Sequence, residues 1–167
     1  MKRYDGETKV VRGILPVDQS AAANTQGEWV SLSKYDSLMV CYTSDVGTGG
    51  QDPSVALRQA TSATGSGAKT LAAGQWYAVQ DATVGDLADN FAAVGDGDGA
   101  FTDDGETACV ARVEITADQL DVDNDFEFVQ VRVSRGGNTA GKLVAAVYVL
   151  RGARYSAAVP DQPTAVA

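Results

Sequence analysis

Apolar residues cluster most densely in two runs, residues 126–133 and 142–150. In the first run, valines alternate with polar residues, and this period of two predicts a strand with one buried face. The second run is apolar at almost every position and rich in valine, which predicts a strand covered on both faces. The connector, residues 134–141, contains glycine and asparagine and can therefore supply the turn of a hairpin. We predict that these two strands form a hairpin at the centre of an all-β core.

Shorter runs with strand character recur along the rest of the chain, and segments rich in glycine, asparagine and aspartate separate them. These runs are residues 10–17, 28–33, 37–43, 54–61, 69–73, 75–80 and 107–115. Pro16 confines the first run to a sheet edge or ends it. We expect residues 34–36 to form the turn between the second and third runs. Short strands at this spacing predict a β-sandwich or a jelly-roll-like barrel.

The remaining segments carry little regular pattern. Residues 18–27 are predicted to be a loop, and residues 81–106 are predicted to be the longest irregular excursion. Within that excursion, residues 84–93 are compatible with a short helix. Thr116 can cap a helical turn over residues 116–120, and Asp118 suits the positive end of that turn. The helical content is therefore expected to be limited to short turns.

A chain of 167 residues suits a single domain. We assign residues 10–155 to the β-sandwich domain. Residues 1–9 are expected to form a charged, flexible N-terminal arm, and residues 156–167 an extended C-terminal tail.

The chain carries a net charge of −9, which disfavours nucleic acid as a partner. Its longest apolar run is far shorter than a membrane span, and the polar N-terminus lacks the pattern of a secretory signal. We therefore expect a soluble protein that is made in the cytoplasm and does not act on a membrane.

The sequence contains no histidine. This excludes serine–histidine and cysteine–histidine nucleophile pairs and the usual histidine metal sites. Cys41 and Cys109 lie in apolar runs and are expected to be small buried thiols. We predict no enzymatic activity, no catalytic residues and no cofactor.

Two acidic segments are candidates for a calcium-binding loop. Residues 121–125 begin like a calcium loop, but Phe126 stands where the sharp turn requires glycine, and Arg132 stands where a bidentate glutamate is needed. The segment around Asp96 departs from the calcium-loop pattern at the same two places. We interpret both segments as solvated turns and predict no metal site.

Several large side chains are candidates for contact with a partner. Trp29, Trp76, Tyr77 and Tyr148 could line a carbohydrate or peptide groove, although aromatic residues in strand runs usually belong to the core. Arg151, Arg154 and Tyr155 follow the last strand and could anchor a partner subunit, because arginine and tyrosine are favoured in interfaces. An ordinary strand exit is the alternative. The N-terminal arm adds the candidates Lys2, Arg3 and Tyr4.

Three segments together resemble a known group of proteins. They are Gly13-Ile-Leu-Pro-Val-Asp18 with residues 22–32, then residues 117–126, then residues 145–155. This combination resembles small structural proteins of tailed bacteriophages and prophages that are encoded among the head genes. The middle of the chain, about residues 62–106, matches poorly, and Asp125 stands where the relatives have glycine. The resemblance carries no catalytic residue and implies a part of the virion.

The resemblance leads us to expect a capsid decoration (cement) protein on the exterior of the virion. Its partners would be the major capsid protein and further copies of itself, as a homotrimer or alternatively a pentamer. A vertex protein and a head–tail or tail component are alternatives within the virion. A carbohydrate-binding adsorption module is the alternative from another class.

Overall fold

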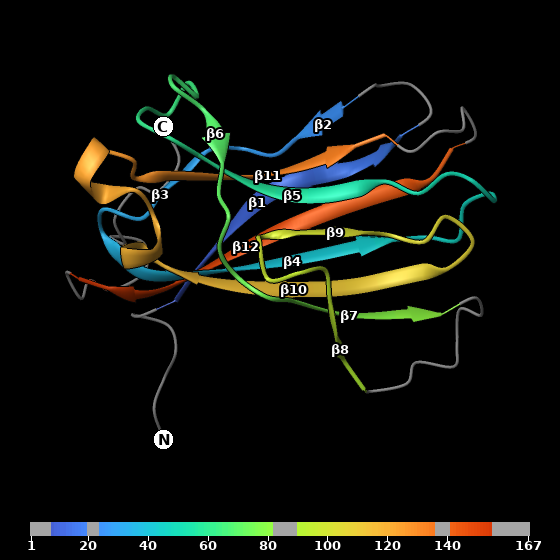
Figure 1. Cartoon of the computed structure of the whole chain (residues 1–167). Helices are drawn as coiled ribbons and strands as arrows, with labels where there is room; N and C mark the ends of the chain where they lie inside the picture. Colours follow the sequence, from blue (N-terminus) through green and yellow to red (C-terminus); the bar gives the residue numbers. More distant parts are fainter. Residues whose placement is uncertain (1–7, 20–23, 82–89, 136–140, 155–167) are drawn as a thin grey trace.

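The computed structural model describes residues 8–19, 24–81, 90–135 and 141–154, and these residues form two packed antiparallel sheets (Figure 1). Sheet A has the strand order β1-β12-β4-β10-β7-β8, and sheet B has the order β2-β11-β5-β6. In sheet B, β3 also pairs with β11, and β9 pairs with β5. The two sheets make a sandwich and not a closed barrel, so the all-β prediction is confirmed.

The strands of sheet A are β1 (Thr8–Asp18), β12 (Leu143–Ala153), β4 (Tyr35–Ser44), β10 (Ala108–Thr116), β7 (Trp76–Asp81) and β8 (Ala92–Val94). Those of sheet B are β2 (Asn24–Gln26), β3 (Val30–Ser31), β5 (Ser54–Ala60), β6 (Lys69–Thr70), β9 (Ala100–Thr102) and β11 (Phe128–Ser134). Strand β1 lies at an edge of sheet A, as Pro16 predicted, and its register shifts twice between Arg12 and Val17. The strand begins at Thr8, so residues 8 and 9 of the predicted arm belong to it.

The core lies between the two sheets and follows the period-two pattern of the sequence. Val129, Val131 and Val133 point inward from β11, and Tyr148 points inward from β12. Trp76 is also fully buried, and its indole N–H donates to the carbonyl of Gly99 at 3.0 Å. Alternation therefore identified the buried face of these strands correctly.

The predicted central hairpin is wrong. Strand β11 lies in sheet B, whereas β12 lies in sheet A between β1 and β4, so the connector crosses from one sheet to the other. Both strands are central in their own sheets, and each already has a neighbour on either side. Periodicity identifies which face of a strand is buried, but it does not identify the strand's partner.

The prediction that the second run is covered on both faces is also wrong. Strand β12 alternates between buried and accessible residues, and Val147 is 41% exposed. Its outward residues are apolar as well, which is why the run lacks visible alternation in the sequence.

Two segments contain more strand than the sequence predicted. Strand β2 lies in the expected loop of residues 18–27, and β8 and β9 lie in the expected irregular excursion. The helix suggested for residues 84–93 falls largely outside the described residues, and its last two residues belong to β8. Strands β3 and β4 belong to different sheets, so the turn between them joins the sheets instead of closing a hairpin.

The predicted helical turn after β10 is present as a 3-10 turn, Ala117–Gln119. The side chain of Gln119 accepts the N–H of Thr116 at 2.9 Å. A second 3-10 turn, Val122–Asn124, ends at Asp125, which has a left-handed φ of 62°. Both turns lie at one end of the sandwich, beside β3 (Figure 1).

Candidate functional site

The outer face of sheet A is apolar over most of its width. We define this outer face by the side chains that alternate with the core-facing residues of β1, β12, β4, β10 and β7. Its apolar members are Val10, Met39, Tyr77, Val79, Val110, Leu143, Val147 and Val149, joined by Phe91. Val10 lies opposite Val149, which lies opposite Met39, so these side chains form a continuous row across three strands.

Most of the exposed large apolar residues in the described chain belong to this face. They are Val10, Tyr77, Phe91, Val110, Leu143 and Val147, with exposed fractions between 38% and 66%. Soluble monomers rarely leave a contiguous apolar patch of this kind uncovered, and such patches usually mark interaction sites. The outer face of sheet A is therefore the strongest candidate for an interaction surface.

Arginine side chains are interspersed among these apolar residues. The guanidinium of Arg112 lies 5.1 Å from the ring centroid of Phe91, and Arg151 lies 3.6 Å from the carboxylate of Glu114. Arg12 pairs with Glu28 at 2.7 Å. A shallow hollow of about 290 Å³ lies between Arg112, Arg151 and the side chain of Tyr77. Two of these arginines are thus paired with glutamates, and Arg112, which lies beside the Phe91 ring, is the remaining cation of the group.

The outer face of sheet B is polar by contrast. Arg58 on β5 and Arg132 on β11 occupy outward positions and are partly exposed, whereas Gln130, at an outward position of β11, is buried and donates to the carbonyl of Gly27. The guanidinium of Arg58 lies 6.0 Å from the centroid of the Trp29 ring. The two faces of the sandwich therefore differ, and most of the exposed large apolar residues lie on the outer face of sheet A.

The four aromatic candidates do not form a common groove. Trp76 and Tyr148 are fully buried, which confirms the core interpretation for them. Trp29 lies beside Arg58 of sheet B, whereas Tyr77 is on the outer face of sheet A. The two that reach the surface therefore lie on different sheets.

A groove of about 580 Å³ lies at the end of the sandwich that carries the 3-10 turns. Its apolar lining comes from Leu32, Ala117, Leu120, Val122 and Phe126. Asp118, Asp125 and Glu127 also line it, together with Arg154 as a basic residue. We call this site the end groove. Each of the three segments that carry the phage resemblance contributes to it: residues 22–32, 117–126 and 145–155.

Basic residues near the end groove are already engaged. Arg154 Nε lies 3.5 Å from a carboxylate oxygen of Asp36. Lys69 lies 4.1 Å from the ring centroid of Phe126 and also pairs with Asp121, and this hydrogen bond lowers the pKa of the Asp121 carboxyl. The acidic residues Asp118, Asp125 and Glu127 therefore give the lining an excess of negative charge.

The residues predicted as partner contacts divide into two groups. Arg151 and Arg154 are exposed near the end of β12, the first on the outer face of sheet A and the second at the end groove. Lys2, Arg3, Tyr4 and Tyr155 lie outside the described residues. Apart from Tyr77, the sequence did not indicate the apolar residues of the outer face, because they share their runs with core residues.

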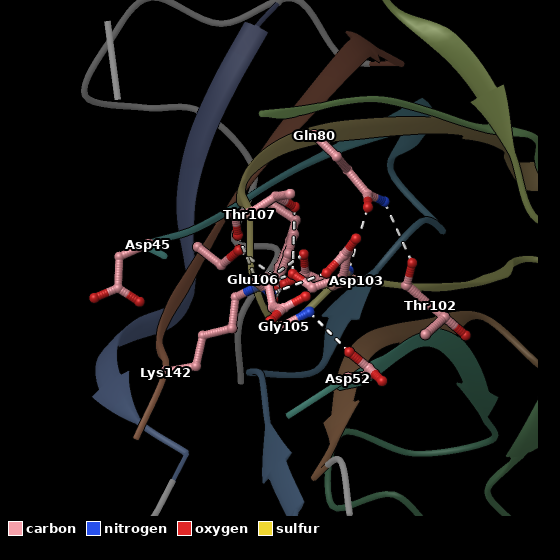
Figure 2. Close-up of polar contacts among 12 residues, drawn as sticks. Asp45, Asp52, Gln80, Thr102, Asp103, Gly105, Glu106, Thr107 and Lys142 are labelled. Atoms are coloured by element: carbon pink, nitrogen blue, oxygen red, sulfur yellow. Dashed lines mark hydrogen bonds and ion pairs between the residues drawn. The ribbon is translucent and has the colours of Figure 1, made fainter. Parts of the chain in front are cut away.

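A buried ion pair holds the opposite end of the sandwich together (Figure 2). Lys142 Nζ lies 3.1 Å from Asp103 Oδ1, and both side chains are completely buried. The hydroxyls of Tyr42 and Ser44 donate to Asp103 Oδ2 at 2.8 and 2.7 Å. Lys142 also donates to the carbonyls of Asp104 and Thr107, at 2.5 and 3.0 Å.

This cluster fixes the loop between β9 and β10 to the start of β12. Burial raises the pKa of the Asp103 carboxyl, and Lys142 and the two hydroxyls offset that rise in part. The loop is also held from outside, because the N–H of Gly105 donates to Asp52 Oδ1 at 2.8 Å. We interpret the cluster as structural. A lysine beside an otherwise apolar run was the signal that could have indicated it.

Both cysteines are free thiols, and burial raises the pKa of each. Cys109 is buried as predicted, whereas Cys41 is half-buried and pairs across the strands with Val147 of the outer face.

In the described part of the chain, no three acidic or cysteine residues gather closely enough to hold a metal ion. None of the described segments is a helix that could span a membrane.

Comparisons with known proteins give matches among solved structures alone. No protein-family model matches the chain, and no curated protein matches its sequence. The chain is similar to the SPBc2 prophage-derived protein YomS, with 9% identity and a TM-score of 0.42, over 86% of this chain and 93% of that chain. It is also similar to a structure of infectious bursal disease virus Gt strain, with 10% identity and a TM-score of 0.23, over 87% of this chain and 41% of that chain. At these TM-scores the function has to be argued from the residues of the chain itself.

Proposed function

We propose that the protein is a structural component of a bacteriophage virion, and most specifically a capsid decoration protein that binds the outer surface of the head. The observation that carries this proposal is the outer face of sheet A. It presents apolar side chains across several strands, and no other described segment covers it. Such a face would become stable in water by packing against another protein.

The charges on this face favour a different protein over a second copy. A symmetric contact whose twofold axis passes near Arg112 would bring this arginine close to the same arginine of the other copy. Like charges at close range disfavour that arrangement. A partner surface with apolar residues and acidic groups suits the face better, and we assign that role to the major capsid protein.

The phage resemblance supports the choice of a virion over other assemblies. The three segments that carry it lie in the strands β1 and β12, which pair in sheet A, and around the end groove. A vertex position and a head–tail or tail position remain the alternatives within the virion. Imaging of the particle would distinguish them by density at local threefold axes, at fivefold vertices or at the neck.

Binding to capsids that lack the protein tests the proposal. The purified protein is expected to bind such capsids and to raise the temperature at which they break. Val147→Glu places a charge in the middle of the outer face, where burial against a partner is costly. It should weaken capsid binding at least about tenfold, which corresponds to about 1.4 kcal/mol.

Val46→Glu is the matched control, because Val46 is exposed to nearly the same extent, 40% against 41%, but lies in the loop after β4. This variant should bind like the unmodified protein. Circular dichroism should show that both variants keep the fold. Equal binding by the two variants, or no binding by the unmodified protein, would overturn the proposal.

A further inference from the structure

Three arginines on or beside the outer face of sheet A differ in whether the chain itself supplies a counter-charge. Arg12 pairs with Glu28 at 2.7 Å, and Arg151 pairs with Glu114 at 3.6 Å. Arg112 forms no ion pair with any residue in the described part of the chain. Among these three arginines, Arg112 is therefore the one whose charge the described residues leave unmatched.

Arg112 lies among apolar residues and not at the edge of the sheet. Its neighbours across the strands are Cys41 of β4 and Tyr77 of β7. Val110 lies two residues earlier on the same face of β10, and the centroid of the Phe91 ring is 5.1 Å from the guanidinium. A partner that covers these apolar side chains therefore also removes Arg112 from water.

Removing a guanidinium from water is costly unless an anion pairs with it. The ring of Phe91 attracts the cation but carries no net charge, so it offsets only part of this cost. Because no carboxylate of the described chain pairs with Arg112, the partner has to supply one. We infer that Arg112 binds an aspartate or glutamate side chain of the major capsid protein, an inference that rests on the proposed function.

The hollow beside Arg112 provides a place for this side chain. Its volume of about 290 Å³ is at the small end of ligand pockets, which measure about 300–1,000 Å³, and suits a single side chain. The charged residues of its lining are Arg112, Arg151 and Glu114, which leave one net positive charge. The planar guanidinium of an arginine can also donate to both oxygens of a carboxylate, which a lysine cannot do in the same geometry.

Binding of variants to capsids that lack the protein tests the inference. Arg112→Gln removes the cation and should weaken binding at least about tenfold. Arg112→Lys keeps the charge but loses the planar donor geometry, so its affinity should lie between those of Arg112→Gln and the unmodified protein. Arg58→Gln is the matched control, because Arg58 also lies beside an aromatic ring, 6.0 Å from the centroid of Trp29, but on the outer face of sheet B. This control should bind like the unmodified protein, and circular dichroism should show that all variants keep the fold.

Chemical crosslinking identifies the group that Arg112 contacts. A carbodiimide joins an amine to a carboxylate in direct contact with it and does not react with arginine. Arg112→Lys bound to the capsids should therefore form an amide link between position 112 and an aspartate or glutamate of the major capsid protein, detected by mass spectrometry of the digested complex. Arg58→Lys should form no such link from position 58.

The possible failures are distinguishable. Equal binding by Arg112→Gln and Arg58→Gln would overturn the inference and leave the capsid-binding role of the outer face intact. A bound Arg112→Lys protein without a link from position 112 to the capsid protein, or with a link to a second copy of this chain, would overturn it as well. If the unmodified protein did not bind capsids, the proposed function would fall and this inference with it.

Discussion

Lys142 and Asp103 are the two fully buried charged side chains of the described chain. Burial removes the hydration of both charges. The ion pair and the hydrogen bonds to nearby hydroxyl and carbonyl groups offset the free-energy cost of this desolvation. Lys142→Met would leave a buried carboxylate with two hydroxyl partners and no cation. We expect this variant to lose about 3–5 kcal/mol of unfolding free energy in urea titrations.

The loss should become smaller on acidification. Burial raises the pKa of Asp103 above the ordinary value of 3.8, so the folded state takes up a proton at a pH where the unfolded chain is still ionised. The unfolding free energy contributed by this group therefore increases as the pH falls through the folded pKa towards 3.8. Without Lys142 the ionised form of the Asp103 side chain is destabilised further. The variant should therefore recover more unfolding free energy in acid than the unmodified protein does.

Lys69→Met is the matched control for this change, because Lys69 also pairs with an aspartate but is 45% exposed. Exposed ion pairs contribute about 1 kcal/mol or less. Similar losses for the two variants would contradict the assignment of Lys142 as a structural cation. A loss in Lys142→Met that does not change with pH would contradict the role given to Asp103.

At Val131, strand β11 of sheet B also forms a hydrogen bond with a residue of sheet A. Strand β2 pairs with residues 132–134 of β11 and β3 pairs with residues 128–129, so a gap in the ladder lies between them. The N–H of Val131 falls in this gap and donates to the hydroxyl of Tyr148, on the opposite sheet, at 2.9 Å. A core tyrosine thus completes the hydrogen bonding of a strand to which it does not belong.

Tyr148→Phe keeps the ring but leaves the N–H of Val131 buried without an acceptor. We expect this variant to lose about 1–3 kcal/mol of unfolding free energy, the usual cost of a buried unsatisfied donor. Tyr77→Phe removes a hydroxyl from a tyrosine that is 43% exposed and should cost less than about 0.5 kcal/mol. If Tyr148→Phe were as stable as Tyr77→Phe, the hydrogen bond between the sheets would have no energetic role.

At the scale of elements, the sequence predicted local structure well and pairing poorly. The alternating valines of β11 and the glycine-rich turn after β5 are where the pattern placed them. The hairpin of residues 126–150 is absent, because a crossover between sheets uses the same glycine-rich composition as a tight turn. The outer face of sheet A could not be predicted as a whole either, since the same apolar amino acids occur at its exposed positions and in the core. Arg154 was the predicted contact that also lines the end groove.

At the scale of the whole molecule, aromatic side chains connect the two sheets. The ring of Trp76, in sheet A, lies 4.9 Å from that of Phe101 in β9, and Phe101 lies 5.9 Å from Tyr42 of β4. Phe101 therefore packs between two strands of the opposite sheet. One sheet could not open without exposing core residues of the other, so we expect both sheets to unfold in one cooperative transition.

The two tryptophans can test this, because Trp76 lies in the core face of sheet A and Trp29 lies beside Arg58 of sheet B. In Trp29→Phe the fluorescence reports on Trp76, and in Trp76→Phe it reports on Trp29. Within each variant, the urea midpoint from fluorescence should equal the midpoint from circular dichroism. The midpoints of the two variants will differ from each other, because replacing the buried Trp76 also removes its hydrogen bond to Gly99. If Trp29 fluorescence changed at a lower urea concentration than the circular dichroism of the same variant, sheet B would open before sheet A, and the shared core would not couple them.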